Sequence, residues 1–205
     1  MSRRLFVVAA PSGAGKTSLV KALLAAEPGL RVCVSHTTRT QRPNEQHGRD
    51  YWFVTPADFQ AIVEADGFLE HAKVFDNHYG TSRLALEQAF RDGSGVILEI
   101  DWEGARQVRQ RVPDCTSIFI LPPSRAELEH RLRSRRTDSD DVIARRLRDA
   151  VSDMSHFDEF DYVIVNDDFD RAVSDLRRIV SGQGVDLVRD RPALAPLVQD
   201  LLART

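Results

Sequence analysis

The chain has 205 residues, a formal net charge of −3, 42% hydrophobic residues and 29% charged residues. These values are ordinary for a globular protein, and the length suits one α/β domain with a large core. The slightly acidic balance does not favour a nucleic-acid-binding protein, and no apolar run is long enough for a membrane span. Cys33 and Cys115 lack metal-ligand spacing and are expected to be buried free thiols. We therefore expect a cytoplasmic protein with no nucleic-acid or membrane partner, whose oligomeric state stays open.

A phosphate-binding loop is predicted near the start of the chain. Residues 5–9 are apolar and β-branched, which predicts a buried strand. A small-residue loop with two glycines follows, and an apolar helical pattern begins after it. Strand, glycine-rich turn and helix in this order are typical of a loop whose backbone N–H groups and helix dipole bind phosphate. The predicted ATP-binding residues are Ala10, Pro11, Ser12, Gly13, Ala14, Gly15, Lys16 and Thr17.

Three residues of this loop carry separate expectations. Lys16 would reach the outer phosphates, and the Thr17 hydroxyl would be a ligand of Mg²⁺. Ala10 stands where the general pattern has glycine. Glycine is required only where φ is positive or a ligand approaches very closely, so we expect a negative φ at Ala10. The loop predicts nucleoside triphosphate binding but does not identify the reaction.

Continuous apolar segments alternate with helical patterns along the rest of the chain. This alternation predicts an α/β fold with a parallel sheet that is covered on both faces. Capping boxes are predicted at Ser124–Glu127 and Thr137–Asp140. A short amphipathic stretch, 194–202, predicts a peripheral helix. The predicted strands are 5–9, 32–34, 95–100, 117–121 and 162–165, and the predicted helices are 17–26, 82–92, 102–112, 124–135, 140–157 and 168–182.

Residues 35–80 interrupt the alternation and predict a small, mostly β insertion. A polar loop precedes a short strand at 51–54 and a helix opened by Thr55 and Pro56. A strand at 68–75 and a turn at 76–80 complete the predicted insertion.

The insertion contains residue types that suit a second phosphate. Arg39 and Arg42 lie close together in one loop, and two arginines can bind a phosphate together with tyrosine hydroxyls. Tyr51 and Tyr79 supply such hydroxyls. Glu70 lies among apolar residues, where an unpaired carboxylate is costly, and a guanine base offers two donors on one edge. The residues alone equally allow solvated arginines and a Glu70 paired with a neighbouring Lys or His.

Arginines are frequent between residues 125 and 148. Such a run usually marks a solvated helix face, but helical phase at ~100° per residue separates its members. Arg131 and Arg135 fall on or beside the apolar face of their helix, and Arg146 borders the apolar stripe of the next one. We expect these three to face a site that requires positive charge.

Motifs in the chain closely resemble those of the guanylate kinase family, in its bacterial type, among the P-loop nucleoside monophosphate kinases. They occur in unbroken order over nearly the whole chain. The motifs are SHTTRTQRP at 35–43, YWF at 51–53, FLEHA at 68–72, YGTS at 79–82, ID at 100–101 and IVND at 164–167, together with the loop at 10–17.

The resemblance implies a transfer of the γ-phosphoryl group of ATP to GMP or dGMP, giving ADP and GDP, with Mg²⁺ as cofactor. It implies an α/β P-loop kinase three-layer fold with a central parallel sheet, a small mixed β-rich GMP-binding insertion and a helical lid. The implied kinase domain spans 3–183. Its parts are a core at 3–34, 81–123 and 158–183, an insertion at 35–80 and a lid at about 124–157, and a tail follows at 184–205.

The resemblance also implies roles for individual residues. Asn166 and Asp167 would contact adenine, and Glu99 stands where the family often has aspartate, which leaves its role open. The implied catalytic residues are Lys16, Arg39, Arg42, Arg131, Arg135 and Arg146. The implied GMP-binding residues are Ser35, Arg39, Arg42, Tyr51, Glu70, Tyr79, Gly80, Thr81 and Asp101.

Two other interpretations stay open. The first is a non-catalytic guanylate-kinase-like module that binds partner peptides, and the intact phosphate loop weighs against it. The second is a small-molecule kinase that acts on a phosphorylated ribose, and the set Ser35, Glu70 and Thr81 weighs against it.

Overall fold

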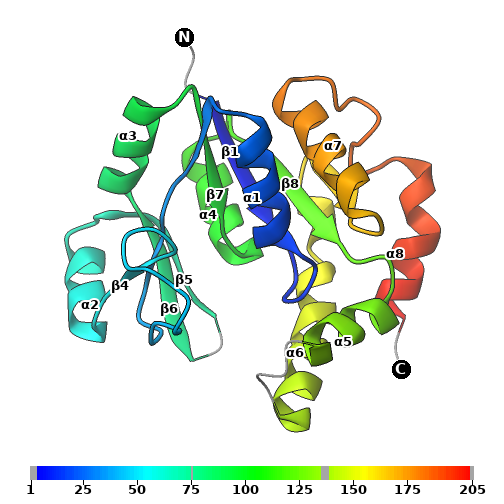
Figure 1. Cartoon of the computed structure of the whole chain (residues 1–205), viewed down its shortest axis with the longest axis horizontal. Helices are drawn as coiled ribbons and strands as arrows, with labels where there is room; N and C mark the ends of the chain where they lie inside the picture. The colour runs from blue at the N-terminus through cyan, green and yellow to red at the C-terminus, as the bar shows by residue number, and fades with distance from the viewer. Residues whose placement is uncertain (1–3, 75, 135–138, 204–205) are drawn as a thin grey trace. The chain divides into compact units, whose positions relative to one another are not determined.

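The computed structural model describes residues 4–74, 76–134 and 139–203 (Figure 1). The chain divides into two compact units, the first comprising residues 1–7 and 28–116 and the second comprising residues 8–27 and 117–205. Strand β1 (Arg4–Ala9) begins in the first unit and ends in the second. Among the described residues, no helix combines the length and the apolar character of a membrane span. The predicted boundaries of core, insertion, lid and tail stay predictions.

A five-stranded sheet has the strand order β2-β7-β1-β8-β9. Its other strands are β2 (Leu30–Val32), β7 (Gly95–Glu99), β8 (Thr116–Leu121) and β9 (Tyr162–Val165). β2 pairs with β7, and β8 with β9, in parallel register. Every residue of β1 after Arg4 is buried, as expected for a strand that is covered on both faces. The predicted central parallel sheet is confirmed, although β2 lies two residues earlier than the sequence indicated.

A smaller four-stranded sheet belongs to the first unit and has the order β4-β3-β6-β5. β3 (His36–Thr37) pairs in parallel with β4 (Trp52–Phe53), whereas β6 (Asn77–Ser82) is antiparallel to both β3 and β5 (Phe68–Val74). The predicted small mixed sheet is therefore confirmed. The turn predicted at 76–80 is wrong for most of its length. Tyr79 and Gly80 pair with β3 on one side and β5 on the other, so tertiary pairing overrides local turn preference.

Three helices belong to the first unit: α2 (Pro56–Glu64), α3 (Arg83–Asp92) and α4 (Trp102–Arg111). α2 begins with a capping box between Thr55 and Asp58 and packs through Phe59, whose ring centroid lies 4.6 Å from that of Phe68. α4 packs against β5, the edge strand of the small sheet. The Gln107 side chain accepts the N–H of His71 at 3.2 Å and donates to its carbonyl at 2.8 Å. α4 thus pairs with the open side of β5.

Five α-helices of the second unit are α1 (Lys16–Ala26), α5 (Arg125–Ser134), α6 (Asp140–Met154), α7 (Phe169–Val180) and α8 (Ala195–Leu202). α1 packs on α7, and α6 contacts both α5 and α8. Ser139 caps α6 by accepting the Val142 N–H, and Thr137, where a capping box was predicted, lies outside the described residues. α6 ends at Met154, short of the predicted Phe157, and a 3₁₀ turn (Phe157–Glu159) follows. The predicted tail helix is confirmed as α8.

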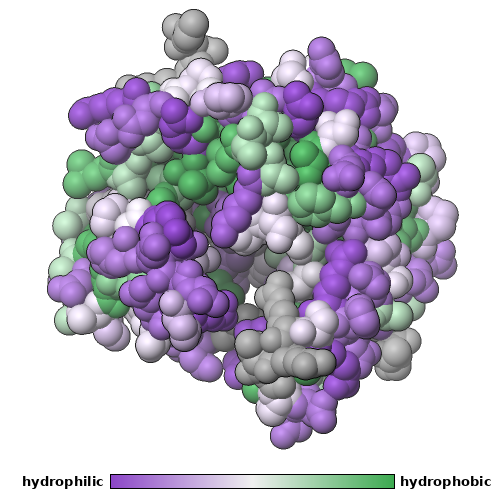
Figure 2. Space-filling model, viewed as in Figure 1, coloured by the Kyte–Doolittle hydropathy of each residue, from purple (hydrophilic) through white to green (hydrophobic). Residues whose placement is uncertain are grey.

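Most of the large hydrophobic side chains that the structure describes are buried. Hydrophilic residues cover most of the face in Figure 2, and the exposed large hydrophobic side chains are scattered along the chain. Cys33 and Cys115 are both buried thiols outside any disulfide, as predicted.

Candidate active site

The loop between β1 and α1 has the backbone that its sequence predicts. Gly13 and Gly15 have φ angles of 94° and 95°, in the left-handed region that favours glycine. Ala10 is not among the described residues with positive φ, so its predicted conformation is confirmed. α1 begins directly after Gly15, and no side chain caps its N-terminus. A phosphate suits such an end, because it can accept hydrogen bonds from first-turn N–H groups and is attracted by the helix dipole.

Packing within the second unit fixes the loop. A Cβ at Gly13 would lie 3.0 Å from Cδ1 of Leu128 on α5. A Cβ at Gly15 would lie only 2.4 Å from Nδ2 of Asn166, just after β9. This amide, which is 5% exposed, donates to the carbonyl of Ala14 at 2.7 Å. Asn166, predicted as an adenine contact, therefore braces the loop backbone through its side chain.

The first two residues of α1 are Lys16, which is half-buried, and Thr17, which is exposed. Thr17 presents a hydroxyl oxygen in the first turn of the helix, and Mg²⁺ prefers oxygen ligands alongside nucleotide phosphates. The residues present therefore fit a magnesium–nucleotide complex.

Two of the three predicted lid arginines lie in the described part of the chain. Arg131 Nε donates to Glu127 at 2.7 Å, and its Nη2 donates to the Asn166 carbonyl at 3.0 Å. Arg131 is thus held beside the residue that braces the loop. Arg146 is half-buried on α6, and Arg135 lies outside the described residues.

Asp167, the other predicted adenine contact, is exposed and forms an ion pair with Arg171 of α7. Burial raises the pKa of Asp167, but the hydrogen bonds from Arg171 and the Asp168 amide outweigh it and lower the pKa. Its carboxylate is thus charged at neutral pH.

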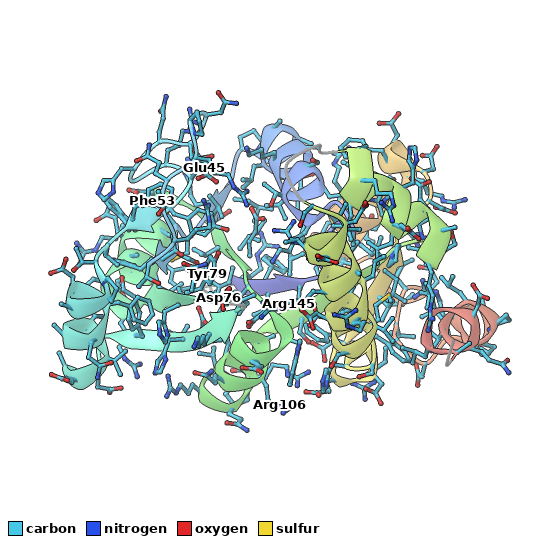
Figure 3. The ribbon with its side chains drawn as sticks, turned by 90° about the horizontal axis from the view of Figure 1, so that it is seen from below. Glu45, Phe53, Asp76, Tyr79, Arg106 and Arg145 are labelled. Atoms are coloured by element: carbon cyan, nitrogen blue, oxygen red, sulfur yellow. The ribbon has the colours of Figure 1, made fainter. Side chains whose placement is uncertain are left out.

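The first unit contains a cluster around Arg39, whose side chain is 16% exposed. The guanidinium carbon lies 5.5 Å from the ring centroid of Tyr51 and 5.7 Å from that of Phe53. The rings of Tyr51 and Tyr79 are 5.9 Å apart, and Arg39 Nη2 donates to Glu45 at 2.7 Å. We call Arg39, Glu45, Tyr51, Phe53 and Tyr79 the Arg39 cluster, and Figure 3 labels its members Glu45, Phe53 and Tyr79.

The surroundings of Arg39 and Tyr51 keep both side chains protonated. Burial lowers the pKa of Arg39, but hydrogen bonds with Glu45 and Tyr79 outweigh it and raise the pKa. Burial, assisted by Tyr79 and Glu99, raises the pKa of Tyr51 to about 12. The cluster can therefore offer a cation and a hydroxyl donor to an anion. Arg42, by contrast, has a 61% exposed side chain, and its backbone N–H donates to Glu45 at 2.9 Å.

A second cluster surrounds Glu70, which is 2% exposed on β5. Its Oε1 accepts the Thr81 hydroxyl at 2.5 Å, and Thr81 Oγ1 lies 3.5 Å from Ser35 Oγ. Its Oε2 lies at the start of α4, because a Cβ at Gly104 would be only 2.5 Å from it. Asp101 caps the same helix end by accepting the Gly104 N–H at 2.7 Å. We call these five residues the Glu70 cluster.

The structure adds partners of Glu70 that the sequence did not suggest. The sequence alone left open a Lys or His neighbour and the donors of a guanine base. The carboxylate accepts the Thr81 hydroxyl and lies at the N-terminal end of α4, whose dipole attracts an anion.

Strand β6 connects the two clusters. Tyr79 belongs to the Arg39 cluster and Thr81 to the Glu70 cluster, and residues two apart on a strand point to the same face. Gly80 between them is buried, and a Cβ at this position would lie 3.0 Å from ring atoms of Phe68. One face of β6 therefore joins a cationic, hydroxyl-rich cluster to a carboxylate with hydroxyl neighbours.

Sequence reasoning missed Glu45, Phe53 and Gly104. Glu45 follows Arg42 by three residues in a polar turn, and a carboxylate next to paired arginines is a signal that points to an ion pair. Phe53 was read only as part of a strand. Nothing local distinguishes Gly104, because its importance depends on Glu70 from a distant segment.

Comparisons with known proteins agree over nearly the full length of the chain. A family model described as guanylate kinase matches residues 2–183. A guanylate kinase of Methylococcus capsulatus is 56% identical over 198 residues, covering 97% of each chain. One of Alkalilimnicola ehrlichii is 55% identical over 202 residues, covering 98% of this chain and all of that protein. A crystal structure of guanylate kinase from Anaplasma phagocytophilum superposes with a TM-score of 0.70 at 30% identity, covering 98% of this chain and 96% of the other.

Proposed function

The chain belongs to the guanylate kinase family, and we propose that it transfers the γ-phosphoryl group of ATP to GMP through the residues described above. ATP is bound by the loop 10–17, with Lys16 at the outer phosphates. GMP is bound by the two clusters on β6, with its phosphate at the Arg39 cluster and its base at the Glu70 cluster.

The Glu70 cluster carries the proposal. Its carboxyl group is buried and is already aligned by the hydrogen bond from Thr81. Guanine presents a ring N–H and an exocyclic amine on one edge, and a carboxylate accepts both. Adenine lacks this pair of donors, so binding AMP would leave a buried oxygen without its hydrogen bond. That loss costs roughly 1–3 kcal/mol or more.

Phosphoryl transfer needs alignment and charge neutralisation more than covalent help. Arg39, Tyr51 and Tyr79 orient the GMP phosphate oxygen for in-line attack on the γ-phosphorus. The bond from that phosphorus to the β–γ bridging oxygen breaks, and ADP leaves. Lys16, with Arg131 and Arg146, stabilises the charge that develops on the transferred group and on the leaving oxygen. Arg42 and Arg135 complete the proposed set of cationic residues.

Magnesium is the proposed cofactor. When bound, Mg²⁺ would neutralise part of the charge on the ATP phosphates. Thr17 would hold it by its hydroxyl. Acceptance of dGMP and a cytoplasmic location are part of the same proposal.

A substrate panel tests the proposal. We expect ADP formation from ATP with GMP, little with AMP, and none with phosphorylated riboses. The variant Glu70→Gln should lose at least tenfold of the preference for GMP over AMP, because its amide no longer accepts both guanine donors. Glu64→Gln, at an exposed residue of α2, is the matched control and should keep it.

The panel also separates the remaining interpretations. No turnover with any acceptor would favour a non-catalytic binding module. Turnover with phosphorylated riboses but not with GMP would favour the other kinase class. Equal rates with AMP and GMP would overturn the role given to the Glu70 cluster.

A further inference from the structure

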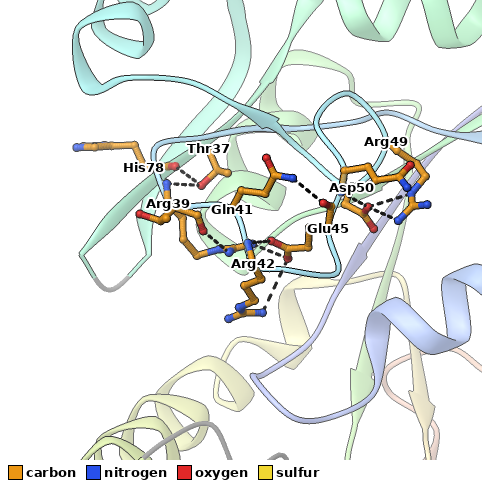
Figure 4. A network of polar contacts seen from close by, with 10 residues as sticks. Thr37, Arg39, Gln41, Arg42, Glu45, Arg49, Asp50 and His78 are labelled. Carbon is orange, nitrogen blue, oxygen red and sulfur yellow. Dashed lines mark hydrogen bonds and ion pairs between the residues drawn. The ribbon is translucent and has the colours of Figure 1, made fainter.

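Glu45 uses both oxygens of its carboxylate within one loop of the first unit (Figure 4). Oε1 accepts the Arg39 guanidinium at 2.7 Å, and Oε2 accepts the backbone N–H of Arg42 at 2.9 Å. The Glu45 side chain is only 17% exposed, so both contacts are partly shielded from water.

The backbone of Glu45 closes the same loop. Its N–H donates to the Arg42 carbonyl at 3.0 Å, and its carbonyl accepts the Gln41 side-chain amide at 2.6 Å. A single residue thus joins three others of the segment from 39 to 45. The conformation of this loop depends on Glu45 more than on any apolar packing that its exposed neighbours Arg42, Pro43 and Asn44 provide.

The pairing leaves Arg39 able to bind a second anion. A guanidinium has five N–H groups in a planar fork, and Glu45 and the Thr40 carbonyl each accept from one terminal nitrogen. Burial raises the pKa of Glu45, but the hydrogen bonds from Arg39 and the Arg42 amide outweigh it and lower the pKa. Glu45 is therefore a permanent anion at neutral pH.

We propose, on the basis of the function proposed above, that Glu45 is a positioning residue for the GMP phosphate. It holds the Arg39 guanidinium against the rings of Tyr51 and Phe53 before GMP arrives. Without it, Arg39 keeps its charge but loses its fixed direction, and ordering a long side chain again on binding costs affinity. If Glu45 instead competed with the GMP phosphate for Arg39, removing its charge would strengthen GMP binding.

Calorimetric titration with GMP and with guanosine tests this role. Guanosine presents the same base without the phosphate, so the ratio of the two dissociation constants reports the phosphate end alone. We expect Glu45→Gln to weaken GMP binding about tenfold, the usual effect of losing one hydrogen bond to a charged group. Guanosine binding should change less than twofold. Glu45→Asp keeps the charge but is too short for both contacts, and it should give an intermediate loss.

Asp50→Asn is the matched control. The Asp50 carboxylate accepts the Gln46 N–H at 2.9 Å and pairs with Arg49 at 2.8 Å, so it holds the other end of the same loop. This variant should leave the GMP-to-guanosine ratio within twofold of wild type. If Asp50→Asn raises this ratio of dissociation constants as much as Glu45→Gln does, general loosening of the loop explains both effects and the specific role of Glu45 is wrong.

The remaining outcomes are also decisive. Tighter GMP binding in Glu45→Gln would show competition and overturn the proposal. An unchanged ratio in a folded Glu45→Gln would overturn it as well. The proposed function would still stand in that case if the wild-type protein prefers GMP over AMP. If Glu45→Gln does not fold, a ratio of dissociation constants in Glu45→Asp that equals the wild-type ratio counts against the proposal in the same way. A wild-type chain that binds GMP no better than guanosine would instead overturn the assignment of the Arg39 cluster itself.

Discussion

The phosphate sites that we propose for the two units differ in what forms them. In the second unit the proposed site is formed by backbone: a loop with two left-handed glycines and a helix N-terminus without a side-chain cap. In the first unit it is made of side chains, from residues 39, 45, 51, 53 and 79 on separate segments. A site made of backbone requires tight packing around its glycines, which Asn166 provides at Gly15. A site made of side chains requires partners that hold them in place, as Glu45 holds Arg39.

Lys16→Ala should give the largest effect. Loss of the cation at the outer phosphates removes transition-state stabilisation, and we expect kcat to fall about 10²–10³-fold or more. GMP binding and the thermal midpoint should stay near wild type, because GMP is assigned to the other unit. Steady-state kinetics with calorimetry would check this, with Lys21→Ala on the exposed face of α1 as the control. Near-normal turnover would refute the role of Lys16.

Asn166→Asp tests whether the loop depends on its brace. The substitution replaces an amide donor with an acceptor facing the Ala14 carbonyl, 2.7 Å away in the wild type. We expect the KM for ATP to rise about 10- to 100-fold, because the loop must move to relieve the repulsion. The KM for GMP should remain within a few fold. Asp170→Asn, at an exposed residue in the first turn of α7, is the control. An unchanged KM for ATP would argue that the loop is rigid without Asn166.

Gly104→Ala tests the proposed base-binding end and should affect GMP rather than ATP, the reverse of Asn166→Asp. The added Cβ would meet Glu70 Oε2 at 2.5 Å. A carboxylate at the end of a flexible side chain can shift, so the fold should tolerate the methyl group. The displaced carboxylate should raise the KM for GMP about tenfold and leave the KM for ATP unchanged. Equal changes in both values would contradict the division of labour between the units.

Tyr51 should produce the smallest effect, visible only in alkali. Its pKa of about 12 exceeds the ordinary value of 10, so between these values the folded chain binds more protons than the unfolded chain. The free energy of unfolding should therefore fall as pH rises from about 10 to about 12. Denaturant titrations should show a smaller fall in Tyr51→Phe. An equal fall in both proteins would assign the effect to other groups.

The sequence predicts these two regions unequally. The loop 10–17 is contiguous, so its conformation and even the negative φ of Ala10 follow from local rules. Gly15 could be predicted from its turn, but its contact with Asn166 joins residues 151 positions apart, and no periodicity reveals such a pair.

The acceptor region shows the same limit more strongly. Physical reasoning found the charged residues Arg39 and Glu70 and left their partners open. The strand β6 was read as a turn, yet it is the element that joins the two clusters. Pairing with two neighbouring strands decides its conformation, and that information is absent from the segment itself.

The contact of α4 with β5 has a consequence for the behaviour of the protein at high concentration. β5 is an edge strand with a row of backbone groups that another chain could use for pairing. Gln107 occupies both groups of His71, and Arg111 donates to the Leu69 carbonyl. At the opposite edge, β4 is only two residues long. At one edge of the small sheet, side chains of α4 cover backbone groups of β5. At the other edge, β4 is too short to offer a long row of such groups. Both features hinder edge-to-edge aggregation. Gln107, to which we assign no part in the chemistry, thus covers backbone groups of β5 that another chain could otherwise use for pairing.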